Sequence, residues 1–325
     1  MTTLAIGCAA ALAVTFVLWQ SLGALVAWKL LYSDHHEFDV RQTPSDFGID
    51  ALSLTVPVDD QHDLAGWLIT PTRQASLGGA CIVMVHGFDS GKDKVWQFPE
   101  DDDYSASTIQ QGAQSLWQAG FHVVAIDLRN HGESSDNGPV TLGARESDDV
   151  LATLEYLQAN AHSLGIDPNR IGLRGESMGA VTCLIAAARD QQNRVAAVWS
   201  DSAFADAGSA ILDFMRYKRI PAVFGPPARS WLVRLTGLDL GEASPIEVIN
   251  QIDCPVLLTH SSSDLMLPIS HLQRLASACT TGRAATWSLA AHQHNRLWRE
   301  PQYLDLQVNF FKQHLLGEMP ICNVA

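Results

Sequence analysis

Short apolar runs alternate along this chain with longer amphipathic segments, and this alternation restricts the fold more than any other feature. The run Ala80–Val85 (ACIVMV) is apolar throughout, as expected of a strand that is buried on both faces of a sheet. Strands that alternate with helices predict a mostly parallel central sheet with helices on both faces. The predicted strands are Ile49–Val56, Leu64–Ile69, Ala80–Val85, Phe121–Ile126, Arg170–Leu173, Val195–Trp199, Pro255–Thr259 and Ala284–Leu289. The predicted helices are Ser105–Gln118, Ser147–His162, Ser177–Arg189, Ile269–Ala278 and Pro301–Leu315.

One segment, residues 204–250, interrupts this alternation. It contains Pro221, Pro226 and Pro227 between short helical patterns. In a doubly wound sheet an insertion at this point lies over the carboxyl ends of the strands, where ligands bind. The segment is therefore either a lid over the site or a helical excursion without a role in it.

The N-terminal segment predicts a membrane helix, because its first 28 residues contain no charged residue and no histidine. As a helix, Leu4–Trp28 rises roughly 37 Å, enough to cross the ~30 Å hydrocarbon core of a bilayer. A cleaved signal peptide is the alternative, but it requires a basic start and a small-residue cleavage site, for which Leu25–Ala27 is a poor candidate. A buried helix is a third alternative. We expect an uncleaved single-pass anchor, and Lys29 and Arg41 after the span favour a cytoplasmic catalytic domain.

These patterns divide the chain into a transmembrane anchor at residues 1–31, a polar linker at 32–48 and a catalytic domain at 49–325. The net charge of −14 and the lack of a basic stripe argue against a nucleic-acid partner. The acidic run Glu100–Asp103 lacks metal-ligand spacing, and we expect a solvated loop there. Since phosphate loops, flavin motifs and haem ligands are also absent from the sequence, we expect no cofactor and no metal.

The chemistry centres on Gly175-Glu176-Ser177-Met178-Gly179, which joins a predicted strand to a predicted helix. This context is what a nucleophile elbow requires, because the tight turn needs small residues two positions before and after the serine. The turn also exposes the serine hydroxyl at the helix N-terminus. The pattern predicts that Ser177 is a nucleophile.

Other motifs follow neighbouring strands. His86-Gly87-Phe88 ends one buried strand, and such a loop supplies one amide of an oxyanion hole, while the residue after the nucleophile, Met178, supplies the other. Asp264 follows a late strand, and His292 and His294 follow the last one. The order Ser, Asp, His is thus present.

Together these motifs resemble the α/β-hydrolase-fold serine hydrolases, in their esterase and dipeptidyl-peptidase-like branch, over about residues 50–316. The run Asp127–Ser134 (D-x-R-x-H-G-x-S) belongs to the resemblance, which implies a structural role for Asp127, His131 and His86. One departure is Ser262, which stands where the family usually has a glycine, two residues before the acid.

The resemblance implies a triad of Ser177, Asp264 and His294, with Phe88 and Met178 as oxyanion-hole amides. We favour His294 over His292 as the base, because the family's histidine stands several residues beyond the last apolar strand position. Asp201 is the rival acid.

The expected function is hydrolysis of a carboxylic ester in a small-molecule or peptide acyl substrate, through an acyl-enzyme intermediate. A peptidase, amidase or thioesterase on the same fold is the alternative. A non-catalytic membrane-tethered scaffold is less favoured, because the nucleophile and the histidine are both kept. The sequence leaves the oligomeric state open.

Overall fold

The computed structural model describes residues 2–32, 43–60, 62–72, 74–88, 90–92, 112–136 and 138–318. The predicted loop Glu100–Asp103 and most of the predicted linker lie outside these ranges, as does the N-terminal part of the predicted helix Ser105–Gln118. Of that helix the structure describes α2, Gln114–Gln118.

The centre of the molecule is an eight-stranded sheet with the order β1-β2-β4-β3-β5-β6-β7-β8. β1 pairs with β2, and β2 with β4, in antiparallel orientation, whereas every other neighbouring pair is parallel. The strands are β1 Ala51–Asp59, β2 His62–Ile69, β3 Cys81–Val85, β4 His122–Ile126, β5 Ile171–Glu176, β6 Val195–Asp201, β7 Val256–Ser261 and β8 Ala284–Leu289. The predicted fold class, a mostly parallel α/β-hydrolase sheet, is confirmed.

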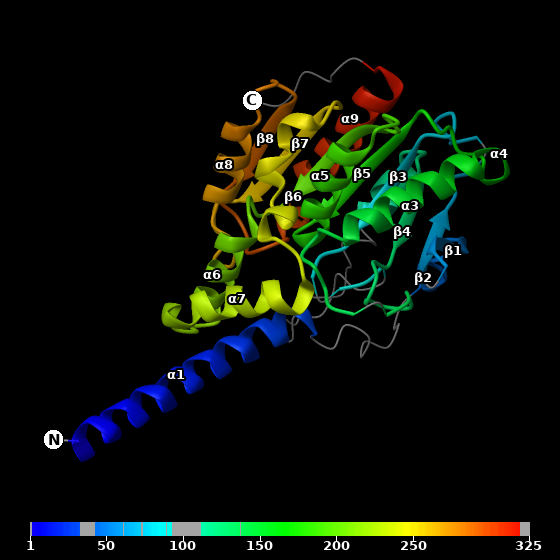
Figure 1. The fold of residues 1–325 in the computed structure, drawn as a ribbon. Helices are drawn as coiled ribbons and strands as arrows, with labels where there is room; N and C mark the ends of the chain where they lie inside the picture. The colour runs from blue at the N-terminus through cyan, green and yellow to red at the C-terminus, as the bar shows by residue number, and fades with distance from the viewer. Residues whose placement is uncertain are drawn as a thin grey trace.

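Helices cover both faces of the sheet, as Figure 1 shows. On one face, α3 (Glu146–Ala159), α5 (Met178–Arg189) and α8 (Ser270–Ala278) bury apolar residues against alternate strand residues such as Val83 and Val85. On the other face, α2 and α9 (Pro301–Leu316) pack against Ile82 and Met84. Successive residues of β3 thus enter opposite cores, which explains why its sequence is apolar without interruption.

The strand order changes direction beside β3, because β4 lies on one side of it and β5 on the other. At such a switch point the connections leave β3 and β5 toward opposite faces, and a crevice forms at their carboxyl ends. The loops after β3, β5, β7 and β8 all start at this edge, so residues far apart in the sequence meet there.

The insertion between β6 and β7 contains α6 (Ala207–Tyr217), the short 3₁₀ helix η3 (Ala222–Phe224) and α7 (Gly225–Thr236). Pro226 and Pro227 occupy the first turn of α7, where proline is tolerated because amides there have no intrahelical acceptor. The short 3₁₀ helices Leu240–Ala243, Pro245–Glu247 and Ile249–Gln251 then lead to β7.

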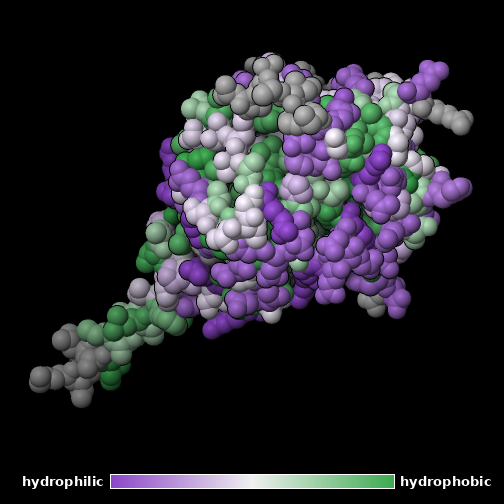
Figure 2. All heavy atoms as spheres, turned by 90° about the horizontal axis from the view of Figure 1, so that it is seen from above, coloured by the Kyte–Doolittle hydropathy of each residue, from purple (hydrophilic) through white to green (hydrophobic). Residues whose placement is uncertain are grey.

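The N-terminal segment is one helix, α1, Thr2–Leu31. Its first half projects from the body in Figure 1, and Figure 2 shows it as a mostly apolar arm beside a mixed, largely polar surface. By length and composition Ile6–Leu31 is long and apolar enough to cross a membrane. Its last turns are not a free tether, because Ala27, Leu30 and Leu31 are buried in the same core as β3 and α5. The predicted boundary after residue 31 therefore separates residues whose side chains pack in one core.

Candidate active site

The turn between β5 and α5 holds Ser177 in a strained backbone conformation, with φ 52° and ψ −116°. The two flanking glycines make this turn feasible. A Cβ on Gly175 would lie 2.2 Å from the carbonyl oxygen of Gly179, and one on Gly179 would lie 2.3 Å from that of His86. Positive φ is costly for a residue other than glycine, and such strain persists where the surrounding structure over-determines it. The elbow geometry thus presents the Ser177 hydroxyl at the carboxyl edge of the sheet.

A chain of hydrogen bonds leads from this hydroxyl to a buried carboxylate. Ser177 Oγ lies 2.8 Å from His294 Nε2, and His294 Nδ1 lies 2.6 Å from Asp264 Oδ2. Since the carboxylate accepts the Nδ1 proton, Nε2 is the ring atom that accepts the serine proton. The structure therefore brings together the three side chains selected from the sequence, with Asp264 and His294 both buried.

The Asp264 carboxylate is held by the turn that follows β7. The amides of Met266 and Leu267 donate to Oδ1 over 2.8 and 2.9 Å, while Oδ2 faces His294. Burial would raise the pKa of this carboxyl, but the His294 ring, a second histidine and the Leu267 amide hold the pKa well below its ordinary value. Asp264 is accordingly ionised at neutral pH and can stabilise a positive charge on His294.

That second histidine, His260 on β7, was missed in the sequence analysis. Its Nε2 donates to the carbonyl oxygen of Leu267 over 2.8 Å and lies 3.4 Å from Asp264 Oδ2. Burial would lower the pKa of His260, but the Asp264 carboxylate and the Leu267 carbonyl outweigh burial, so the pKa is raised. The available signal in the sequence was the place of His260 at the carboxyl end of a strand, four residues before the candidate acid Asp264.

The two rival residues are engaged elsewhere. His292 has a positive φ of 63°, and its Nε2 lies 2.8 Å from Glu300 Oε1. Asp201 accepts hydrogen bonds from the hydroxyls of Tyr303 and Ser202, over 2.7 and 3.0 Å. Among the described contacts, neither rival side chain is bonded to Ser177 or His294, although the backbone carbonyl of Asp201 accepts from the Ser177 amide over 2.8 Å.

The loop after β3 lies against the elbow. A Cβ on Gly87 would be 3.3 Å from Ser177 Cβ, which places the backbone of His86–Phe88 next to the nucleophile. The His86 ring fixes this loop, because its Nδ1 donates to the Gly87 carbonyl over 2.7 Å and its Nε2 accepts from the Leu128 amide over 3.0 Å. Met178 is the first residue of α5, and the first amides of a helix have no intrahelical acceptor. The loop that contains Phe88 and the first turn of α5, which contains Met178, thus both lie next to Ser177, and their role as an oxyanion hole stays a prediction.

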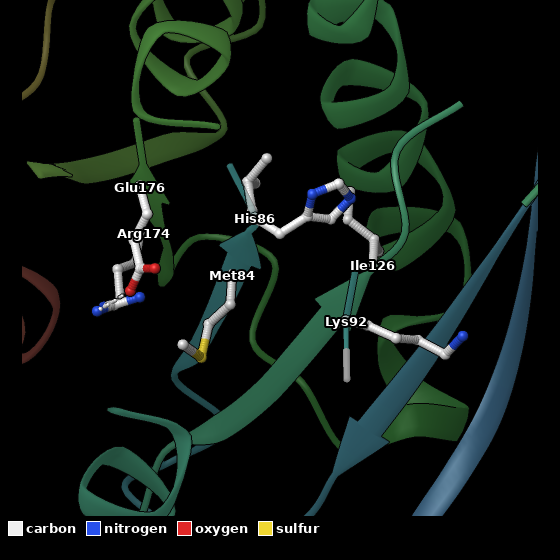
Figure 3. A pocket seen from close by; sticks show the side chains of 7 residues that line it. Met84, His86, Lys92, Ile126, Arg174 and Glu176 are labelled. Atoms are coloured by element: carbon white, nitrogen blue, oxygen red, sulfur yellow. Dashed lines mark ion pairs between the residues drawn. The ribbon is translucent and has the colours of Figure 1, made fainter. Parts of the chain in front are cut away.

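A buried polar layer lies beneath the elbow, and the sequence analysis missed it too. Arg174 and Glu176, both on β5, form an ion pair with an N–O distance of 2.6 Å, and both side chains are 2% exposed. Figure 3 shows this pair beside Met84 at a small cavity, with the Lys92 ammonium pointing away from it. Arg174 Nε also donates to Gln307 of α9. The bond from Arg174 to Gln307 joins β5 to α9 and so helps to hold β5, and with it the elbow, in one position.

The D-x-R-x-H-G-x-S loop is held by internal contacts, as its expected structural role requires. Asp127 accepts from Lys92 Nζ and from the amide of Glu133, and Ser134 Oγ donates to the Asp127 carbonyl over 2.7 Å. His131 Nδ1 donates to the Arg129 carbonyl over 2.8 Å. Within the part of the chain that the structure describes, no group of three or more His, Cys, Asp or Glu side chains is arranged to hold a metal ion.

Comparison with protein families gives a match to the prolyl oligopeptidase family over residues 107–316. The uncharacterized protein YqkD of Bacillus subtilis (strain 168) is 32% identical over 158 residues, which are 48% of this chain and 50% of that protein. The chain thus spans about half the length of that relative. The esterase YjfP of Escherichia coli (strain K12) is 26% identical over 254 residues, which are 75% of this chain and 93% of that protein.

Solved structures show the same architecture. An esterase of Pyrococcus furiosus superposes with a TM-score of 0.68 at 20% identity, covering 88% of this chain and 99% of that one. The acylaminoacyl peptidase of Pyrococcus horikoshii superposes with a TM-score of 0.60 at 18% identity, covering 83% of this chain and 42% of that one. At such identities the likeness concerns the fold alone.

Proposed function

The chain belongs to the prolyl oligopeptidase family of α/β-hydrolases, and on that premise we propose that it cleaves carboxylic esters with Ser177 as the nucleophile. The family match and the similarity to the esterase YjfP support a hydrolase activity. The observation that carries the proposal is the hydrogen-bonded chain from Ser177 Oγ through His294 to Asp264.

In the proposed mechanism Ser177 Oγ attacks the ester carbonyl while His294 Nε2 takes its proton. The negative charge that develops on the carbonyl oxygen is stabilised by the amides of Phe88 and Met178, each contributing about 3 kcal/mol. The imidazolium, oriented and stabilised by Asp264, then gives its proton to the departing alcohol. Water, deprotonated by His294, finally attacks the acyl-enzyme, releases the carboxylic acid and restores Ser177.

The choice of ester over amide rests on the relatives. The chain aligns with almost the whole of the Pyrococcus furiosus esterase but with less than half of the acylaminoacyl peptidase. The family name nevertheless favours a peptidase or amidase as the second candidate, and a thioesterase stays open on the same chemistry. A membrane-tethered scaffold is the remaining alternative, and the intact hydrogen-bonded chain at Ser177 argues against it.

We also propose that α1 is an uncleaved anchor, with the catalytic domain on the cytoplasmic side. One long apolar N-terminal helix supports an anchor, and a signal sequence would pass the same test. Two contacts before Trp28 favour the anchor, because cleavage near Trp28 would remove the buried Ala27 and the close approach of Gly23 to Pro227 of α7, whereas Leu30 and Leu31 would stay. Lys29 at the end of the span supports the orientation.

The test combines labelling with kinetics. Full-length protein in detergent is treated with a fluorophosphonate and assayed on p-nitrophenyl esters of rising acyl length, beside an anilide and a thioester. We expect labelling and ester turnover in the wild type, and neither in Ser177→Ala. Ser163→Ala, at an exposed serine of α4 (Ala161–Leu164), is the control that keeps both. Labelling that survives in Ser177→Ala would assign the nucleophile elsewhere, and a folded wild type that is not labelled would favour the scaffold.

A further inference from the structure

The membrane helix is docked on the insertion. Gly23 lies so close to α7 that a Cβ there would be 2.4 Å from Cβ of Pro227. Toward the body, the Val140 amide donates to the carbonyl oxygen of Leu31 over 3.0 Å. Away from the body, Trp19 Nε1 donates to the carbonyl oxygen of Val223 over 2.7 Å. The connection η3, which contains Val223, is therefore the part of the insertion that reaches furthest along α1.

The length of α1 determines how close η3 lies to the bilayer. In the candidate span Ile6–Leu31, residues 6–18 are exposed and Trp19 begins the docked part. Those exposed residues rise only about 20 Å as a helix, whereas the hydrocarbon core of a bilayer is ~30 Å thick. A membrane that covers the span must therefore extend to the docked turns, and this brings η3 to the level of the lipid headgroups.

The exposed surface of the insertion suits that location. Its exposed large apolar side chains are Leu212, Tyr217, Val223, Val233 and Leu235, and Val223 is 61% exposed. Its exposed basic side chains are Arg216, Lys218, Arg219, Arg229 and Arg234. We call these ten side chains the insertion surface. Apolar groups beside Lys and Arg are the pattern of interfacial helices that bind membranes with anionic lipids.

Charge separates this surface from the rest of the chain. Residues 207–236 contain five basic residues and one acidic residue, Asp213, in a chain whose net charge is −14. Two of the cations lie over aromatic rings, Lys218 at 5.6 Å from the Tyr217 ring and Arg234 at 5.2 Å from the Trp231 ring. A cation over an aromatic ring combines an apolar body with a charged tip, which is the combination found at a bilayer interface.

We propose that the insertion surface docks on the anionic headgroups of the membrane that α1 crosses. The proposal rests on the anchor proposed above and on no assumption about the substrate. It makes the insertion a membrane-facing platform at the carboxyl edge of the sheet, beside the loops that carry Ser177 and His294. A free acidic protein would suit the charges of this surface, but it would not explain the exposed apolar residues next to a membrane helix.

The experiment places one environment-sensitive fluorophore (NBD) at either of two matched valines. Val14 on α1 and Val223 on η3 are both 61% exposed. Each is changed to Cys in full-length chains whose Cys8, Cys279 and Cys322 are replaced by Ser. The remaining cysteines are buried, and burial raises the pKa of Cys254 to about 12, so these thiols stay unlabelled. The chains are placed in nanodiscs of phosphatidylcholine with or without phosphatidylglycerol, either one chain per disc or, in a parallel sample, two.

We expect both probes to report an apolar environment in discs with phosphatidylglycerol, with the Val223→Cys probe quenched by headgroup-level quenchers and the Val14→Cys probe by acyl-chain quenchers. Lys218→Gln/Arg234→Gln should lower the ratio of docked to undocked insertion about 30-fold, since each basic residue contributes roughly a factor of five at an anionic surface. The Val14→Cys probe should not change. The control Arg170→Gln/Arg283→Gln, which alters residues preceding β5 and β8 at the opposite edge, should change neither probe.

The two probes separate the modes of failure. If the Val223→Cys probe reports water while the Val14→Cys probe reports the bilayer interior, docking is overturned and the anchor stands. Aqueous signals at both positions overturn the anchor, and docking with it. A signal at 223 that appears only in discs with two copies assigns the insertion surface to a second copy of the chain, which also overturns the proposal.

Discussion

Two regions meet at the carboxyl edge of the sheet, and they are held in different ways. The loops around Ser177 are held by hydrogen bonds among buried polar groups, such as those that fix Asp264 and the His86 ring. The insertion is held on α1 mainly by close apolar packing at Gly23 and by two indole hydrogen bonds, including the one from Trp231 to Gln20. Polar contacts set atomic positions in the first region, whereas surface shape sets them in the second.

This difference predicts different responses to substitution. A single substitution near Ser177 should abolish turnover and leave the fold intact, because few atoms carry the proposed chemistry. A substitution between α1 and α7 should weaken packing and leave the chemistry intact. The predictions below test this separation.

The largest effect is expected at the proposed base. His294→Ala should lower kcat on a p-nitrophenyl ester by a factor on the order of 10⁶, because single removal of a triad nucleophile or base has that effect in a serine protease. His292→Ala, the control two residues away, loses only a contact with Glu300 and should stay within a few-fold of wild type. The opposite ranking would assign the base to His292.

The proposed acid comes next. Asp264→Asn should lower kcat by a factor on the order of 10⁴, because the amide cannot hold the ring in the required tautomer. Asp201→Asn removes a charge that is bonded to Tyr303 and Ser202, so it should affect stability more than turnover. Turnover that depends on Asp201 and not on Asp264 would move the acid to β6.

Substitutions at two glycines of α1 test the packing between α1 and α7. Gly23→Ala places a methyl group 2.4 Å from Pro227, and overpacking of this kind costs about 1–3 kcal/mol of unfolding free energy. Gly7→Ala meets no atom within 4 Å and should be neutral or slightly stabilising in a helix. Urea unfolding in detergent measures both, and the turnover of a water-soluble ester should be unchanged in both. Loss of turnover in Gly23→Ala would show that the two regions are coupled.

The smallest effect is electrostatic and appears at acidic pH. The folded-state pKa of Asp264 is lowered, so the unfolded chain binds more protons at this site below about pH 4. The stability supplied by this carboxylate is therefore complete above that pH and is lost as the pH falls toward the folded-state pKa, by up to about 1.4 kcal/mol per pH unit. Asp264→Asn should flatten the dependence of the unfolding free energy on pH between pH 5 and pH 3. An unchanged slope would contradict this assignment.

Much of the fold was predictable, because it depends on local patterns. Apolar runs predicted all eight strands, and the glycines around Ser177 predicted a turn into which a Cβ at position 175 or 179 does not fit. The order of motifs selected Asp264 and His294 as well, and the structure places both in hydrogen-bonded contact with each other. Their roles in catalysis remain predictions.

The features that the sequence did not predict depend on contacts between residues far apart in the chain. The bond of Arg174 on β5 to Gln307 on α9 joins residues 133 positions apart, and no local pattern indicates that these two buried side chains meet. The packing of α1 against α7 could not be predicted from the sequence for a similar reason. Because α1 is apolar all round, its sequence does not indicate which side faces α7.

The contact between α1 and the insertion has a consequence for the order of folding. The residues joined by its hydrogen bonds, Trp19 with Val223 and Gln20 with Trp231, are 204 and 211 positions apart. During synthesis α1 leaves the ribosome long before α7, and in the proposed anchor the side of α1 that contains Gly23 has only lipid to contact until then. The core that includes Leu31 is completed late, so nascent chains arrested before Thr236 emerges should be cut by protease, and longer ones should resist it.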